Sequence, residues 1–190
     1  RYENIQLIGF SDVDLDRAGA FADQFGGKVY ESLEALLEDP AVELVVNLTI
    51  HHAHVEVITK CLEANKHVHT EKPLAMDPGE AMRLVELAER KGLRFSSAPI
   101  TYMGEAQQAA WKAIREGKIG PTRLVYAEVN HGRIESWHPN PEPFYAVGVL
   151  WDVGLYPVTL LTAFYGPIRN VTASAYLLYP DRVTKEGRPF

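Results

Sequence analysis

Residues 43–74, ELVVNLTIHHAHVEVITKCLEANKHVHTEKPL, decide the fold of the chain. The apolar, β-branched run Val42–Thr49 predicts a buried strand that is covered on both faces. Lys66–Thr70 predicts the next strand, and between the two strands apolar residues recur at helical spacing: Val55, Ile58 and Leu62. A strand, a helix and a further strand with short connections predict a parallel pair joined by a right-handed crossover.

The same alternation continues outward on both sides of this segment. Apolar, strand-sized runs occupy Ile5–Phe10, Lys28–Tyr30 and Leu93–Ser97. Helices are predicted between the strands, and two of them begin at capping residues, Ser32 and the box Asp77-Pro78-Gly79-Glu80. This repetition predicts the α/β class, with a doubly wound parallel sheet and helices on both faces.

The pattern changes near residue 100, where we place a boundary between domains 1–100 and 101–190. Alternating stretches replace the buried runs, which is typical of an antiparallel sheet with one solvated face. The second domain is therefore predicted to be α+β. Its predicted elements are helices over Glu105–Glu116 and Val149–Tyr165 and strands over Thr122–Asn130 and Val171–Tyr179.

The composition is that of a globular protein, with 46% hydrophobic and 23% charged residues. The formal net charge is −6, from 19 Lys and Arg against 25 Asp and Glu, and no long basic run occurs. We therefore expect neither nucleic-acid nor membrane binding. Cys61 is the single cysteine, which excludes an internal disulfide framework. We expect a cytoplasmic protein.

Candidate functional residues follow the predicted strands, because ligands of parallel sheets collect at the carboxyl ends of the strands. These ends carry Asp12, residues 49–54 and Glu71-Lys72-Pro73. In dinucleotide-binding folds an acidic residue follows the second strand, about 20 residues after a glycine-rich turn. The chain contains no G-x-G-x-x-G, which leaves two readings. Asp12 is an ordinary turn aspartate, or the first βα unit is absent from the chain.

Three motifs occur in order along the chain. The first lies in residues 43–74 and consists of Thr49, His54, K-H-V at 66–68 and E-K-P at 71–73. The second and third are EGKIGP at 116–121 and GVLWDVGLY at 148–156. In type and order these motifs resemble the T-P-N-x-x-H, G-K-H-V, E-K-P, G-x-I-G and G-G-G-x-L-x-D-x-G-x-[HY] segments of the Gfo/Idh/MocA oxidoreductases. The resemblance covers essentially the whole chain.

The resemblance implies a Rossmann-type doubly wound parallel sheet whose first βα unit is absent, followed by part of an α+β domain with an open, mainly antiparallel sheet. It implies NAD as cofactor, with NADP as the alternative, a small-molecule sugar or polyol substrate, and a homo-oligomer, dimer or tetramer, at full length. Asp12 favours NAD, because it could bond the ribose 2′-hydroxyl and would repel a 2′-phosphate. The chain departs from the family at Ile50, His51 and Asn65, where proline, asparagine and glycine are usual, and keeps only Gly148 of a glycine triplet.

Lys72, Asp152 and Tyr156 are the candidate catalytic residues. Hydride transfer at an alcohol carbon needs a group that moves the hydroxyl proton and a cation or donor that steadies the oxyanion. Tyr156 can carry the proton beside a positive neighbour, because the ordinary pKa of a tyrosine is ~10. Lys72 is that neighbour, and Asp152, four residues before Tyr156, would share a helical face with it. Without the resemblance, Lys72 reads as a surface lysine and Tyr156 as a packing tyrosine.

The remaining candidate contacts come from the same resemblance and from residue chemistry. Cofactor contacts are assigned to Asp12, Thr49, His51, His54, Glu71 and Lys72. Substrate contacts are assigned to Lys72, Asp152 and Tyr156, together with Trp137 and His138. The rings of Trp137 and His138 could form a pocket wall, because aromatic faces suit the C–H faces of sugars, and loop packing is their alternative role.

Two further readings were weighed against an NAD(P)-dependent dehydrogenase or reductase acting on the CH–OH group of a sugar, a polyol or a related cyclic substrate. Residues 51–54, H-H-A-H, lack a fourth ligand at a recognisable zinc spacing, so no metal is expected. The other reading is a catalytically silent sensor or regulator of the same fold that binds dinucleotide and sugar. Retention of Lys72, Asp152 and Tyr156 together favours the enzyme.

Overall fold

The structure, a computed structural model, describes residues 4–190. The chain forms two compact units, Arg1–Ser97 and Ala98–Phe190, and each is a separate body of secondary structure.

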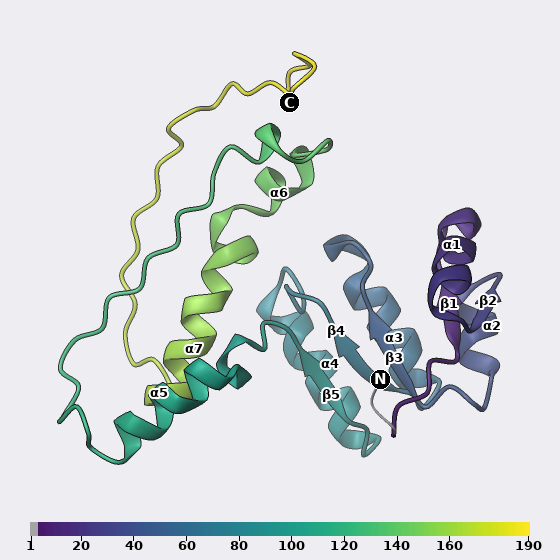
Figure 1. The fold of residues 1–190 in the computed structure, drawn as a ribbon, viewed down its shortest axis with the longest axis horizontal. Helices are drawn as coiled ribbons and strands as arrows, with labels where there is room; N and C mark the ends of the chain where they lie inside the picture. Colours follow the sequence, from purple (N-terminus) through teal and green to yellow (C-terminus); the bar gives the residue numbers. More distant parts are fainter. Residues whose placement is uncertain (1–3) are drawn as a thin grey trace. The chain divides into compact units, whose positions relative to one another are not determined.

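Short strands alternate with helices throughout the first unit (Figure 1). All strand pairs are parallel, so the predicted α/β class with a parallel sheet is confirmed. The strand predicted over Ile5–Phe10 is observed as Gly9–Ser11, which is shorter and begins later in the chain. The strands are β1 (Gly9–Ser11), β2 (Lys28–Tyr30), β3 (Leu44–Asn47), β4 (His67–Thr70) and β5 (Phe95–Ser97), and the helices are α1 (Leu15–Phe25), α2 (Leu33–Glu38), α3 (His54–Glu63) and α4 (Pro78–Arg90).

The sheet of this unit consists of two parts. β1 pairs with β2, and β3, β4 and β5 pair in that order. Doubly wound dinucleotide folds have the strand order 3-2-1-4-5-6, in which the second and fourth strands flank the first. The described strands of this unit do not form one continuous sheet, because no pairing joins β1 or β2 to β3, β4 or β5 among residues 4–190.

Two helix starts are capped as the sequence predicts. Oγ of Ser32 accepts a hydrogen bond from the Ala35 backbone at 3.0 Å, and Oδ1 of Asp77 accepts one from the Glu80 backbone at 2.9 Å. Pro78 takes the first helical position, where a missing N–H costs nothing. These caps fix the residues at which the chain enters α2 and α4.

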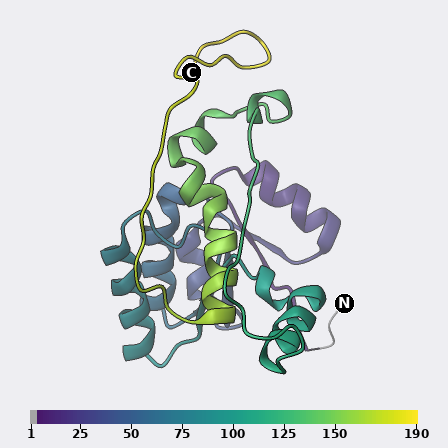
Figure 2. The same cartoon turned by 90° about the vertical axis from the view of Figure 1, so that its left-hand side faces the viewer.

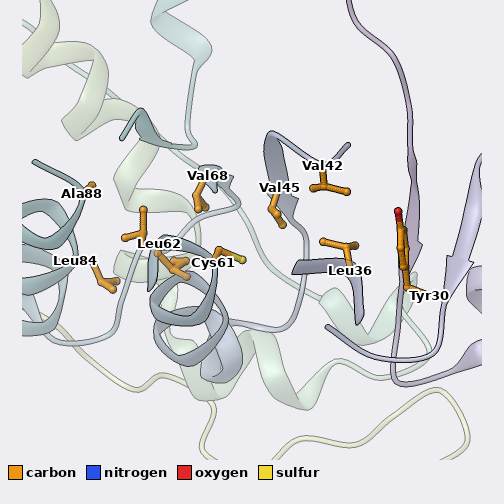
Figure 3. Close-up of a cluster of buried hydrophobic side chains, with 10 residues drawn as sticks. Tyr30, Leu36, Val42, Val45, Cys61, Leu62, Val68, Leu84 and Ala88 are labelled. Carbon is orange, nitrogen blue, oxygen red and sulfur yellow. The ribbon is translucent and has the colours of Figure 1, made fainter. Parts of the chain in front are cut away.

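The core of the first unit joins α3 to the neighbouring strands and to α4 (Figure 3). Ile58, Cys61 and Leu62 of α3 are fully buried and share one cluster with Val45 of β3 and Val68 of β4. Burial of a side chain of this size contributes ~1.5–3 kcal/mol. The apolar surroundings also raise the pKa of the Cys61 thiol to about 11, so the thiol is unreactive while the core is closed.

Strand β3 is covered on only one face by the described residues. Val45 is buried, whereas the side chains that point to the other face, Leu44 and Val46, are 53% and 52% exposed. The prediction of a strand covered on both faces is therefore wrong for residues 4–190. The reason is that α3 and α4 connect neighbouring parallel strands in sequence, and crossovers of one hand place both helices on the same face.

The second unit is built around α5 (Glu105–Arg115) and α7 (Leu155–Tyr165). Trp111 of α5 stacks on Phe164 of α7, with ring centroids 5.9 Å apart and an interplanar angle of 12°. A π-helical turn, Leu150–Gly154, leads directly into α7, and α6 (Glu142–Val147) precedes it. Across residues 4–190, none of the helices combines the length and the apolar character that crossing a membrane requires.

The strands predicted over Thr122–Asn130 and Val171–Tyr179 are not formed within residues 4–190. Both stretches run without regular structure, as Figures 1 and 2 show. The antiparallel pairing described in this unit is an isolated bridge between Val183 and Pro189. A strand forms only where a partner satisfies its backbone groups, and the described residues supply none for these stretches. The mainly antiparallel sheet of the second domain is therefore not made by these residues.

Replacing Leu62 with alanine should destabilise the first unit by ~2–5 kcal/mol, because it opens a cavity in the closed core. The measurement is chemical unfolding combined with the labelling rate of Cys61, which should rise in Leu62→Ala as local opening becomes less costly. The matched control is Met82→Ala on α4, where the side chain is 56% exposed and the change should be small. An unchanged labelling rate in Leu62→Ala would contradict the assigned core.

Candidate active site

The carboxyl ends of β3 and β4 are tied together by a buried asparagine. Asn47, only 2% exposed, donates from Nδ2 to Oγ1 of Thr70 at 3.1 Å. Its Oδ1 accepts hydrogen bonds from the backbone N–H and the hydroxyl of Thr49, at 3.2 and 2.8 Å. Thr49, a predicted cofactor contact, is thus positioned by Asn47, which the sequence analysis did not single out.

His54 links the end of β3 to the turn that follows β4. The side chain is 1% exposed, with Nδ1 at 2.7 Å from the carbonyl oxygen of Pro73 and Nε2 at 2.9 Å from that of Thr49. Carbonyl oxygens only accept, so each of these contacts is a hydrogen bond when the ring nitrogen in it carries the hydrogen. His54 therefore bridges two backbone segments, and its ring is shielded from solvent.

The Glu71-Lys72-Pro73 turn is held at several points. The Glu71 backbone N–H donates to the carbonyl of Asn47 at 2.9 Å, and the Glu71 carboxylate accepts from the Lys72 backbone at 3.0 Å. The Lys72–Pro73 peptide bond is cis. The two hydrogen bonds of Glu71 and the contact between His54 and Pro73 fix the backbone from which the Lys72 side chain projects.

His51 borders a cavity at the same edge of the sheet. The cavity, of about 340 Å³, is lined by His51, His52, Val55, Glu56, Met76 and Glu80. Nε2 of His51 is buried and has no hydrogen-bond partner within the described residues. Burial, with repulsion from His52 and His54, lowers the pKa of His51, so its ring is neutral near pH 7. A buried, unpaired ring nitrogen calls for a polar ligand atom.

Asp12, a predicted cofactor contact, directly follows β1. Both of its carboxylate oxygens are engaged by Arg17, with Nε to Oδ2 at 2.7 Å and Nη2 to Oδ1 at 2.6 Å. Oδ1 also accepts from the Asp14 backbone at 2.9 Å. The Arg17 hydrogen bonds lower the pKa of Asp12, which is therefore ionised at neutral pH. Asp12 was predicted from the sequence as a functional residue, whereas its partner Arg17 was not.

Asp152 lies in the π-helical turn of the second unit and is 8% exposed. Its Oδ2 lies 3.7 Å from Nε2 of His131, a residue that the sequence analysis did not name. Tyr156 stands in the first turn of α7, next to Pro157. Turns of this wide type are frequent at functional sites. Asp152 is thus a buried carboxylate beside an imidazole, one turn before a partly exposed tyrosine.

His131 is part of a cluster of aromatic rings in the same unit. The Trp137 ring makes edge contacts with His131, His138 and Phe144, with centroids 6.1, 5.6 and 6.1 Å apart. His138 also contacts Phe144 at 4.8 Å. The two predicted wall residues, Trp137 and His138, therefore belong to one cluster, and His131 connects this cluster to Asp152. His131 follows the stretch Thr122–Asn130, and no motif in the sequence marks it as a partner of Asp152.

The predicted site residues fall into two groups. Asp12, Thr49, His51, His54, Glu71 and Lys72 belong to the first unit, and Trp137, His138, Asp152 and Tyr156 belong to the second. Within the first unit, the groups that bear on a dinucleotide are an ionised acid at the end of β1 and an unpaired imidazole nitrogen beside a cavity. This donor set fits the ribose and amide groups of a nicotinamide dinucleotide. Among residues 4–190, no cluster of His, Cys, Asp and Glu side chains could hold a metal ion.

Comparison with known proteins identifies the family of the chain. Residues 1–98 match the model of the oxidoreductase family with an NAD-binding Rossmann fold, and residues 107–187 match a Gfo/Idh/MocA C-terminal domain. The cofactor class is thus a nicotinamide dinucleotide.

Curated relatives include the mouse trans-1,2-dihydrobenzene-1,2-diol dehydrogenase, 31% identical over 189 residues, which cover 96% of this chain and 52% of the relative. An oxidoreductase of Rhizobium meliloti is 31% identical over 157 residues, which cover 82% of this chain and 47% of its own. The chain therefore spans about half the length of these relatives.

Two solved structures show the same fold. A 3-ketoreductase from Actinomadura kijaniata in complex with NADP and TDP-benzene superposes with a TM-score of 0.69 at 29% identity, covering 85% of this chain and 50% of that one. A putative NADPH-dependent oxidoreductase from Desulfitobacterium hafniense has a TM-score of 0.73 at 22% identity, covering 87% and 49%, and supports the fold alone. From its two domain matches and its relatives, the chain belongs to the Gfo/Idh/MocA family of oxidoreductases.

Proposed function

We propose that the complete protein transfers a hydride between NAD(P) and a secondary alcohol or ketone of a sugar, a polyol or a related cyclic substrate. The observation that carries this proposal is the buried carboxylate of Asp152, one turn before Tyr156, on the scaffold of an oxidoreductase family. A buried acid next to a tyrosine at a widened helical turn is costly for packing alone and useful for handling a hydroxyl proton.

Each of the three catalytic residues has a distinct part in this proposal. When bound, the nicotinamide supplies or accepts the hydride. The Tyr156 hydroxyl gives a proton to the substrate oxygen in reduction and takes it back in oxidation. The Lys72 ammonium stabilises the negative charge that grows on the substrate oxygen. Asp152 accepts a hydrogen bond from a neighbouring substrate hydroxyl and so orients the ring.

The aromatic cluster around Trp137 supports a cyclic substrate. Rings of this kind pack against the apolar face of a sugar or carbocycle, while Asp152 and His131 offer polar groups next to that face. Among the relatives, one is named as the dehydrogenase of a cyclic diol and another as a ketoreductase. The first name describes a ring that carries hydroxyl groups and the second describes the reduction of a ketone, and we extend both descriptions to the substrate of this chain.

His54 has a positioning role in the proposed reaction. Its two ring nitrogens contact the backbone carbonyl oxygens of Thr49 and Pro73, so it acts on the chemistry through the Glu71-Lys72-Pro73 turn. His54 keeps the backbone of Lys72 in one place, so less conformational entropy is lost when the ammonium group is positioned for the reaction.

Tyr156→Phe should lower turnover by ~10²–10⁴, because it removes a positioned acid–base group and leaves the ring. Dinucleotide affinity should barely change. The measurement is kcat and kcat/KM of the complete protein, with both cofactors, against a panel of sugars, cyclic polyols and their ketones. Tyr165→Phe, on the same helix, is the matched control. Wild-type kcat in Tyr156→Phe, with a deuterium isotope effect showing that chemistry limits the rate, would remove Tyr156 from the mechanism.

Lys72→Met should reduce both turnover and substrate affinity, since it removes the charge that stabilises the substrate oxygen. Because the two residues act as a unit, the Lys72→Met/Tyr156→Phe double variant should be little worse than the poorer single variant. Lys60→Met, at a surface ion pair, is the control. Additive losses would show that the two residues act separately. A wild-type protein that binds dinucleotide and sugar without turnover would instead indicate the sensor.

His54→Gln should cost ~1–3 kcal/mol of stability, because the flexible glutamine amide cannot reproduce the fixed placement of the two ring nitrogens between the Thr49 and Pro73 carbonyl oxygens. It should also lower kcat more than it weakens dinucleotide binding, since the turn that carries Lys72 loosens. Thermal unfolding, calorimetry with NAD and steady-state kinetics measure the three quantities. His52→Gln, an exposed neighbour, is the stability control. A loss of stability with unchanged kcat would confine His54 to a structural role.

A further inference from the structure

The second unit contains a cavity that the proposed reaction does not use. It has a volume of about 700 Å³, and its lining comes from two segments that are far apart in the sequence, residues 133–136 and 179–185. The residues to which the proposed reaction assigns a part lie outside this lining. The cavity therefore needs an explanation of its own.

Arg182, one of the lining residues, is held in place at one end of its guanidinium. Nη1 donates to Oε1 of Glu135 at 3.2 Å and to the hydroxyl oxygen of Tyr145 at 3.0 Å. The guanidinium carbon also lies 4.3 Å from the centroid of the Tyr145 ring, and the Tyr145 hydroxyl donates to Oε2 of Glu135 at 2.6 Å. Because the group is already stacked and hydrogen-bonded, little conformational entropy is lost when it binds a ligand.

The other end of the same guanidinium keeps its hydrogen-bonding capacity. A guanidinium has five N–H groups, and the two bonds of Nη1 account for two of them. Nε and Nη2 donate to none of the other described residues, and the Arg182 side chain is 24% exposed. Nε and Nη2 together form a planar fork that matches two oxygens of a carboxylate or a phosphate. An anion in the cavity could therefore be bound without breaking the contacts of Nη1.

The charges around the cavity favour an anion. Glu135 is ionised, because the hydrogen bond from Tyr145 lowers its pKa, and its charge is balanced by Arg182. The lining as a whole has three basic residues and two acidic ones, which leaves one excess positive charge: Arg133, Arg182 and Lys185 against Glu135 and Asp181.

We propose that this cavity is a binding site for the carboxylate or phosphate group of a small molecule, with two oxygens of that group held by Nε and Nη2 of Arg182. Lys185 and Arg133 supply further positive charge. The Tyr179 ring, which also lines the cavity and is 67% exposed, offers an apolar face to the rest of the ligand. The site makes no use of Asp152 or Tyr156, so it and the proposed reaction can fail independently.

The test is calorimetric titration of the complete protein with inorganic phosphate, glucuronate and glucose 6-phosphate, with glucose as the neutral reference. Arg182→Met should weaken the binding of each anion by ~10–100-fold, because it removes two charge-assisted hydrogen bonds. Arg182→Lys should restore only part of the affinity, since an ammonium group lacks the planar fork. Arg169→Met, at an exposed arginine of the same unit outside the cavity, is the matched control and should change nothing.

Two further variants keep Arg182 and its hydrogen bonds. Lys185→Met should weaken the binding of the anions by ~2–5-fold, and Asp181→Asn should strengthen it by a similar factor, because the two changes alter the local charge in opposite directions. Added salt should weaken the binding of all three anions. These two variants decide the question if thermal unfolding shows that Arg182→Met disturbs the fold.

The three anions also distinguish the sources of the charged group. Tighter binding of glucuronate or glucose 6-phosphate than of inorganic phosphate would support a sugar-like ligand that carries the group, and equal affinities for the two phosphates would support free phosphate. A wild type that binds none of the anions would overturn the proposal, as would unchanged affinities in a folded Arg182→Met. Equal losses in Arg169→Met and Arg182→Met, or unchanged affinities in both Lys185→Met and Asp181→Asn, would overturn it as well.

Discussion

The two hydrogen bonds of His54 are the constraint on which the first unit's site depends. One ring bridges the backbone after β3 and the backbone after β4, and it is closed off from solvent. Parallel strands end at the same edge of a sheet, but the loops beyond them would be free to separate. His54 stops that motion at Thr49 and Pro73 and places a proposed cofactor contact and a proposed catalytic lysine on one fixed frame.

Local electrostatics at the two sheet edges follow different rules. At the end of β1 the acid Asp12 is surrounded by other acids and is balanced by Arg17, so its charge is retained and locally cancelled. At the end of β3 burial keeps the ring of His51 neutral, and its hidden nitrogen lacks a partner among the described residues. Charge is matched where phosphate and ribose are expected, and neutral hydrogen-bonding capacity remains beside the cavity.

Several features of the fold could be predicted because their causes are local. The apolar periodicity of α3 and the caps at Ser32 and Asp77 depend on residues within a few positions of each other. The prediction of strands over Thr122–Asn130 and Val171–Tyr179 was wrong because a strand depends on residues far away in the sequence. Their alternating pattern states a preference for a strand, while a strand exists only where another strand lies beside it.

The sequence by itself determined the family, the parallel α/β first unit and the candidate residues, because motif spacing and helical periodicity are written along the chain. It also placed Lys72 after a strand and Asp152 four residues before Tyr156. Only the tertiary structure decided that His54 clamps two loops, that Asn47 positions Thr49, that Arg17 occupies both oxygens of Asp12 and that His131 lies next to Asp152. Apart from the short-range pairs of Asn47 with Thr49 and of Asp12 with Arg17, these contacts join residues from different segments, and a pairing of side chains across a fold has no period or spacing from which it could be predicted.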